Sequence, residues 1–164
     1  MADALAHAIT TTLWPFLKNE GFQKVTPRKF VRQRSDVFQQ LWVDANGSGG
    51  SKRTCVVLCA SLPFGPVNGY MDPHGSRIAN GRAWNMATPE SAANGMQQVI
   101  EVLRSHELAK LDAISEVEKL LGLLANLPNR NWHSTYSQLH QRWRDKDPEA
   151  LALEQANRVA LKLA

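Results

Sequence analysis

Apolar residues near the start of the chain recur every three or four positions, which is the period of an amphipathic helix. The stripe consists of the apolar Leu5, Ile9, Leu13, Phe16 and Leu17, together with Thr12. Pro15 complicates the helix, because proline lacks an amide donor and crowds the preceding turn. The helix therefore either kinks at Pro15 or restarts with Thr12 near its N-cap. Gly21 suits the left-handed position that ends a helix, and Phe22 can then fold back on Leu17.

The next part of the chain alternates in the way that β-strands do. Strand candidates cover Lys29 to Arg34, Val37 to Asp44 and Thr54 to Leu62, and a fourth lies around Arg82 to Met86. Residues 46–51 form a Gly-rich hairpin loop between the second and third candidates. The third candidate is apolar on both faces, which places it centrally in the sheet. Short connections between the strands favour an antiparallel meander.

The second half of the chain is predicted to be helical. Thr88 to Glu90 is a typical helix start, with an N-cap hydroxyl, a proline and an acid in the first turn. Ser115 to Glu118 has the pattern of a capping box that opens another helix. Further helices are expected near Ser134 to Arg144 and from Asp147 onward. We expect the last one to bury a single apolar stripe, against its own domain or else against a partner: Ala152, Leu153, Ala156, Val159, Ala160 and Leu163.

These patterns predict a single α+β domain over residues 1–164, with an antiparallel sheet of about four strands, an N-terminal helix packed on it and a helical C-terminal half. Hydrophobic residues make up 43% of the chain and charged residues 21%, as in ordinary globular proteins. No apolar run approaches the roughly 20 residues that cross a bilayer, and Met1 to Ala8 lacks the features of a signal peptide. We therefore expect a cytoplasmic protein without a membrane partner.

Motifs for catalysis or metal binding are lacking in the sequence. The Gly-rich loop Gly47 to Lys52 leads into a strand, whereas a phosphate-binding loop leads into a helix. No pair of histidines or cysteines has the spacing of a metal site. Cys55 and Cys59 would lie about 13 Å apart on one strand, too far for a disulfide, so we expect them to be core thiols beside Val57. We predict no metal and no cofactor.

The net charge of +4 is unevenly distributed, because one stretch without acidic residues holds much of the excess: Lys24, Arg28, Lys29, Arg32 and Arg34. Such a stretch suits an acidic partner, either protein or nucleic acid, or is simply a charged edge strand. A second candidate site combines an acid, a base and a cation on the Gly/Pro-rich loop that follows the third strand: Tyr70, Asp72, His74 and Arg77. Asp-Pro and His-Gly pairs are also ordinary turn residues.

Five short motifs stand out along the chain, in this order: Leu13-Trp14-Pro15-Phe16-Leu17-Lys18, Gly21-Phe22-Gln23-Lys24, Phe30-Val31-Arg32, Arg77-Ile78-Ala79 and Trp84. On these motifs, residues 5–125 resemble the bacterial domain of unknown function 4304 family. The resemblance makes Pro15 an expected part of the first helix, and it brings no catalytic residues. Residues 129–164 form a helical extension without a counterpart. Members of such small bacterial families are sometimes encoded beside toxins as immunity proteins.

These observations favour a non-catalytic cytosolic domain that binds another protein, in the form of an immunity protein that neutralises a bacterial toxin. The alternative is a nucleic-acid-binding module that uses the basic strand, with Phe30 for base stacking. A third hypothesis is a hydrolase-like enzyme centred on Asp72, His74 and Arg77. The sequence leaves the oligomeric state and the identity of the partner open.

Overall fold

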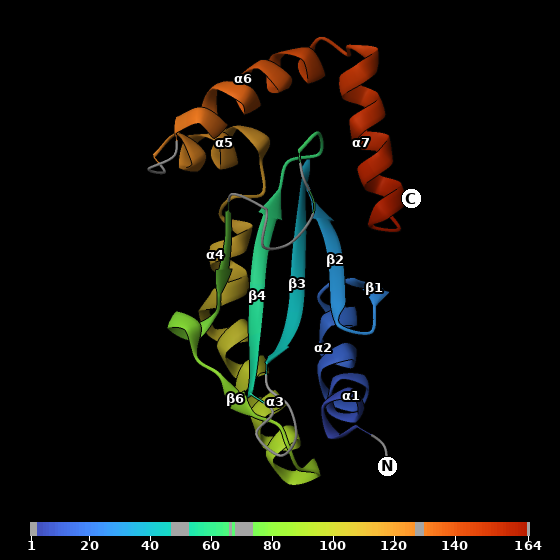
Figure 1. Ribbon diagram of the computed structural model, residues 1–164, viewed down its shortest axis with the longest axis vertical. Helices are drawn as coiled ribbons and strands as arrows, with labels where there is room; N and C mark the ends of the chain where they lie inside the picture. Colours follow the sequence, from blue (N-terminus) through green and yellow to red (C-terminus); the bar gives the residue numbers. More distant parts are fainter. Residues whose placement is uncertain (1–2, 47–52, 66, 68–73, 127–129, 164) are drawn as a thin grey trace.

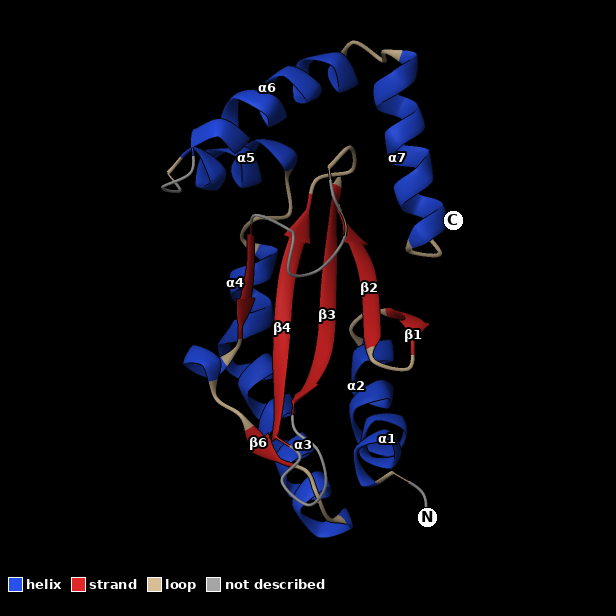
Figure 2. Ribbon diagram, in the orientation of Figure 1, coloured by secondary structure: helices blue, strands red, loops and turns tan. Residues whose placement is uncertain are grey.

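An antiparallel sheet forms the middle of the molecule, with helices packed on one of its faces and three further helices at one end (Figure 1, Figure 2). The structure is a computed structural model that describes residues 3–46, 53–65, 67, 74–126 and 130–163. Tyr70 and Asp72 of the second candidate site lie outside these ranges. The predicted α+β class, with an N-terminal helix and a helical C-terminal half, is confirmed.

The sheet is the predicted antiparallel meander, with the strand order β1-β2-β3-β4-β5. Its strands in chain order are β1 Gln23–Thr26, β2 Lys29–Arg34, β3 Val37–Asn46, β4 Arg53–Ser61 and β5 His74–Arg77. A short β6, Trp84–Asn85, pairs with the first residues of β4. β1 and β5 were not expected as strands. The sequence predicts a loop at β5, since its Gly-containing residues give no strand signal. Pairing with the long β4 supplies the hydrogen bonds that make this segment a strand.

β4 lies in the interior of the sheet, as its apolar sequence predicted, and everything on it after Arg53 is buried. Cys55, Val57 and Cys59 share one face, and both cysteines are buried and form no disulfide. The opposite face of β4 belongs to the main core with the helices. A smaller apolar cluster on the other side of the sheet joins strand residues to the C-terminal segment: Val25, Val31, Phe38, Val67 and Leu161.

The first helical run is continuous and contains the proline. It consists of α1 Ala4–Ala8, a π-helical turn Ile9–Leu13 and α2 Trp14–Asn19. The Trp14 N–H bonds the Ile9 carbonyl five residues back, so the chain widens by one residue just before Pro15. Of the two alternatives, the restart at Thr12 is wrong, because Thr12 lies inside the run. This π-helical turn lets the helix continue through Pro15, which has no N–H to donate.

The end of this run matches the sequence prediction. The Phe22 N–H bonds the Leu17 carbonyl at 2.9 Å, and the Gly21 N–H bonds the Lys18 carbonyl at 3.1 Å. These two bonds define a Schellman ending, with Gly21 at a φ of +85°. The chain therefore turns sharply from the helix into β1.

A second helical run covers the same face of the sheet, made of α3 Pro89–Val102, a π-helical turn Leu103–Glu107 and α4 Leu108–Asp112. Thr88 caps it, as predicted, in a capping box with Ser91. The capping box expected at Ser115 for the next helix, α5 Val117–Ala125, is wrong. The Val117 N–H instead donates to Asp36 Oδ1 at 2.9 Å, across 81 residues of sequence. A carboxylate in the β2–β3 turn thus caps α5.

The last two helices, α6 Arg130–Arg144 and α7 Pro148–Ala160, extend beyond the end of the sheet (Figure 1). α7 begins at the predicted Asp147 cap, whose carboxylate accepts from the Glu149 and Ala150 amides. Burial of the predicted stripe against its own domain is wrong, since most of it is exposed: Ala152, Leu153, Ala156, Val159 and Ala160. Burial against a partner stays a prediction. These five residues are called the α7 apolar face below. Leu163 alone of the predicted set is half-buried, against the smaller cluster.

The opposite side of α7 holds it against the rest of the chain through polar contacts. Asn157 Nδ2 donates to the carbonyls of Pro63 and Gly65, at 2.7 Å each. The Arg158 guanidinium lies over the Phe38 ring, 5.3 Å from its centroid. Leu161, just past the helix, is fully buried. These fixed partners explain why the polar side of α7 faces inward and its apolar side does not.

Candidate functional site

The five cations predicted as one basic surface do not lie together. Side chains alternate along a strand, so β2 directs Arg32 and Arg34 toward the helices and Lys29 toward the other side of the sheet. Lys24 is exposed, with its ammonium 5.2 Å from the Trp14 ring centroid on the helix-covered side. Arg28 stands in the β1–β2 turn. The sheet therefore divides the basic stretch into two groups.

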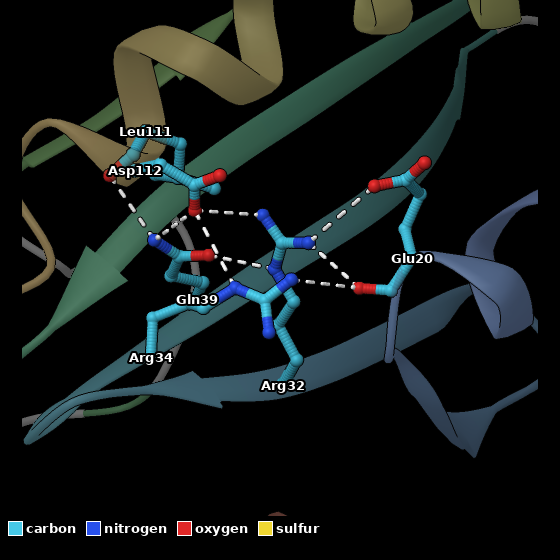
Figure 3. A network of polar contacts seen from close by, with 6 residues as sticks. All are labelled: Glu20, Arg32, Arg34, Gln39, Leu111 and Asp112. Carbon is cyan, nitrogen blue, oxygen red and sulfur yellow. Dashed lines mark hydrogen bonds and ion pairs between the residues drawn. The ribbon is translucent and has the colours of Figure 1, made fainter.

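Arg32 is buried, with 2% of its surface exposed, and it is the centre of a polar network (Figure 3). Its Nη1 donates to the Glu20 carbonyl at 2.7 Å and its Nε to Gln39 Oε1 at 2.7 Å. Its Nη2 forms an ion pair with Asp112 Oδ1 at 2.9 Å. The network joins the end of α2, two strands and the end of α4. Arg32 is thus a structural residue, and its charge does not reach a partner.

Burial lowers the pKa of the Arg32 guanidinium, and the neighbouring Arg34 lowers it further, while Asp112 and Glu20 raise it. Arg34 supports the same network from outside, donating to the Glu20 carbonyl at 3.2 Å and lying 3.6 Å from Asp112 Oδ1. An arginine keeps its proton in such a setting, because its ordinary pKa lies far above neutrality. The sequence held one signal of this, since Arg32 shares a strand face with the apolar Phe30.

The two remaining cations, Arg28 and Lys29, line a groove of about 360 Å³ with Thr26, Trp42 and Val43. The Lys29 ammonium lies 4.8 Å from the Trp42 ring centroid and donates to the Val67 carbonyl at 3.2 Å. Arg28 is 45% exposed and lies 3.8 Å from Asp3. This Trp42 groove offers cations beside an aromatic ring, which suits an acidic side chain next to an apolar one.

A second hollow of about 540 Å³ lies between β5 and the helices. Its apolar residues are Leu58, Leu111, Ile114 and Leu123, and its polar residues are Ser76, Arg77, Asn80, Glu107 and Lys110. We call it the β5 cleft. Of the second candidate site, Arg77 is among the residues that line this cleft, and its guanidinium lies 3.6 Å from Asp44. His74 is the first residue of β5. Asp72 lies outside the described residues, so the acid–base arrangement is not tested.

The turn after β5 has an unusual backbone. Ala79, Asn80 and Gly81 have φ values of 52°, 54° and 83°, so three consecutive residues are left-handed. This conformation is ordinary for Gly81 but costs an alanine about 1–2 kcal/mol. The Ala79 N–H points to Glu107 Oε1 at 3.5 Å, and Lys110 lies 3.7 Å from the same oxygen. The strained turn and α4 together fix the polar rim of the β5 cleft.

The α7 apolar face is the largest departure from what the sequence led us to expect. Val159 is 68% exposed and Leu153 41% exposed. Within the described part of the chain, three of the four large apolar side chains that are exposed lie on α7. Sequence reasoning found these residues as a stripe and missed only the side to which they point.

Comparison with known proteins adds no family or neighbour, because no family model, curated protein or solved structure matches this chain. The resemblance to a family of unknown function therefore stays a prediction from sequence motifs. Among the described residues, no helix combines the length and apolar character needed to cross a bilayer. No group of three or more metal-ligating side chains occurs in that part either.

Proposed function

We propose that this protein is a non-catalytic domain that binds another protein through the α7 apolar face. The observation that carries the proposal is the orientation of α7, whose apolar side faces solvent. Its Asn157 contacts the segment after β4, and its Arg158 contacts Phe38 on β3. Exposed apolar side chains gathered on one element mark an interaction surface. An amphipathic helix gains free energy by burying its apolar side, so a partner that covers Leu153 and Val159 supplies what the fold does not.

The partner carries acidic groups as well, and the Trp42 groove receives them. Arg28 and Lys29 are the members of the predicted basic stretch that line this groove. A cation held over an indole ring favours a carboxylate beside an apolar side chain. In the form suggested by the family resemblance, the partner is a bacterial toxin and this protein is its immunity protein.

Site-specific photo-crosslinking tests the proposal in cells that express the chain together with its genomic neighbours. The probe is p-benzoylphenylalanine, placed at Val159 on the α7 apolar face and, as a control, at the exposed Glu90 on α3. We expect one protein adduct of defined mass from position 159 and none from position 90. Adducts of equal yield from both positions, or none from either, would contradict a binding role for α7.

Charge reversal in the same assay tests the Trp42 groove. Replacing Arg28 and Lys29 by Glu should lower the yield of the position 159 adduct several-fold, mainly through slower association. Lys18→Glu with Arg53→Glu is the matched control, because both residues are exposed and both double variants bring the formal net charge from +4 to zero. Arg32 is left unchanged because it holds the fold together. Equal losses in the two double variants would show a general charge effect and exclude the groove.

A further inference from the structure

The two edges of the sheet are finished differently. At the β1 edge, Lys162 Nζ donates to the Val25 carbonyl at 2.9 Å, and the strand register shifts between Lys24 and Thr26. Covering side chains and bulges are two ways in which proteins prevent further strands from pairing. At the other edge, within the described ranges, β5 pairs only with β4. Its last three residues are exposed, and the β5 cleft opens beside them.

The hydrogen-bond pattern shows which backbone groups of β5 point outward. The Ile78 N–H bonds the Val56 carbonyl at 2.9 Å, so Ile78 faces β4. Facing residues in an antiparallel pair alternate between bonded and non-bonded pairs. Ser76, opposite Leu58, is then bonded to β4, and Gly75, opposite Cys59, is not. The N–H and C=O of Gly75 are therefore directed away from β4, toward the position of a further strand.

The side of β5 that carries Ser76 faces the apolar floor of the cleft. Ser76 pairs with Leu58, and Leu58 lines the cleft with Leu111, Ile114 and Leu123. A residue opposite Ser76 on an added strand would project to the same face, because cross-strand partners share a side of the sheet. The volume of about 540 Å³ accommodates one large apolar side chain and its neighbours.

We propose that β5 accepts an extended segment of a partner protein as an additional strand, with an apolar side chain in the β5 cleft. Gly75 supplies the backbone donor and acceptor, and the cleft supplies specificity for the side chain opposite Ser76. Lys110 on the rim, with a side chain that is 69% exposed, favours an acidic residue elsewhere in the segment. This site is separate from the α7 apolar face, and the inference goes beyond the proposed function by naming a recognition mode.

A second copy of the chain is a poor occupant. Its own β5 would offer only His74, Gly75, Ser76 and Arg77, and none of these residues has an apolar side chain to fill the cleft. A four-residue strand pair also buries far less than the roughly 1,200 Å² of a stable interface. A partner segment differs because it can place a leucine or a phenylalanine opposite Ser76.

The test begins with a phage-displayed library of random 12-residue peptides, selected on the full chain. A selected peptide is synthesised with blocked ends, and its binding is followed by fluorescence anisotropy and by amide shifts of the ¹⁵N-labelled protein. We expect the shifts to centre on Gly75, Ser76 and Arg77. Two further peptides are methylated at alternate nitrogens, one at the odd-numbered and one at the even-numbered positions. One of them should lose binding and the other should bind nearly as the parent peptide does, because only alternate amides face β5.

Two matched variants test the cleft. Leu123→Lys should weaken the peptide at least about tenfold, since Leu123 lines the cleft. Leu151→Lys is the control, because Leu151 has the same 39% exposure but lies on α7. Failure to select any peptide, amide shifts centred elsewhere, equal effects of the two variants or equal effects of the two methylation registers would each overturn the inference. So would a dimer that sedimentation detects in the unmodified chain and not in the Leu123→Lys variant.

This result is independent of the crosslinking result. An adduct from position 159 without peptide binding at β5 would leave the proposed function standing and remove strand addition. Peptide binding at β5 without an adduct from position 159 would support strand addition and contradict the proposed function.

Discussion

We expect replacement of Arg32 by methionine to lower the free energy of unfolding by about 2–4 kcal/mol. The substitution leaves the buried Gln39 amide oxygen without its donor. It also removes the shorter of the two hydrogen bonds that the Glu20 carbonyl accepts, the other coming from Arg34. Each buried polar group that loses its partner costs about 1–3 kcal/mol. Asp112 adds less than a buried carboxylate would, because its side chain is 45% exposed and water can solvate it.

Arg34→Met is the matched control. Arg34 lies two residues away on the same strand face and, like Arg32, contacts Glu20 and Asp112. Its side chain is 42% exposed, so the loss should stay below about 1 kcal/mol. Urea denaturation of both variants measures the difference. Similar losses for the two would mean that Arg32 is not the centre of the network, and the assignment of a structural role to it would be wrong.

Val56→Asp has a still larger expected effect. Val56 is fully buried on β4, opposite Val43 and on the side of the main core. A carboxylate there has no cation across the strand pair, and the penalty exceeds about 4 kcal/mol, enough to unfold a domain of ordinary stability. Val57→Asp should cost less stability, because its cross-strand partner on β5 is the cationic Arg77.

Arg53→Asp serves as the control for Val56→Asp. Arg53 begins the same strand and is exposed, so its replacement should change stability by no more than about 0.5 kcal/mol. Circular dichroism and chemical denaturation check the set. A folded Val56→Asp variant with a small loss would mean that β4 is not the interior strand of the sheet.

Local signals account for the parts of the fold that the sequence predicted. Gly21 and Phe22 end the first helix by contacts within six residues, and Thr88 with Ser91 opens α3 in the same way. The apolar run of β4 indicated a buried strand without knowledge of its neighbours. Each of these features depends on residues close together in the chain, so a pattern of residues is enough to find it.

Long-range contacts account for what was missed. Asp36 caps α5 from 81 residues away, and no pattern around Ser115 contains that information. Periodicity identified the apolar stripe of α7, but the side that docks is chosen by Asn157, whose acceptors at Pro63 and Gly65 lie more than 90 residues away. Arg32 was placed with the surface cations because its acidic partner, Asp112, is 80 residues distant.

Thiol labelling measures the orientation of α7, on which the proposed binding surface depends. The native Cys55 and Cys59 are buried and give a low background. We expect the thiol introduced by Val159→Cys to react with iodoacetamide nearly as fast as in the unfolded chain. The thiol introduced by Leu161→Cys, at a fully buried position, should be protected like the native pair. A protected position 159 beside a reactive position 161 would contradict the orientation and the binding surface inferred from it.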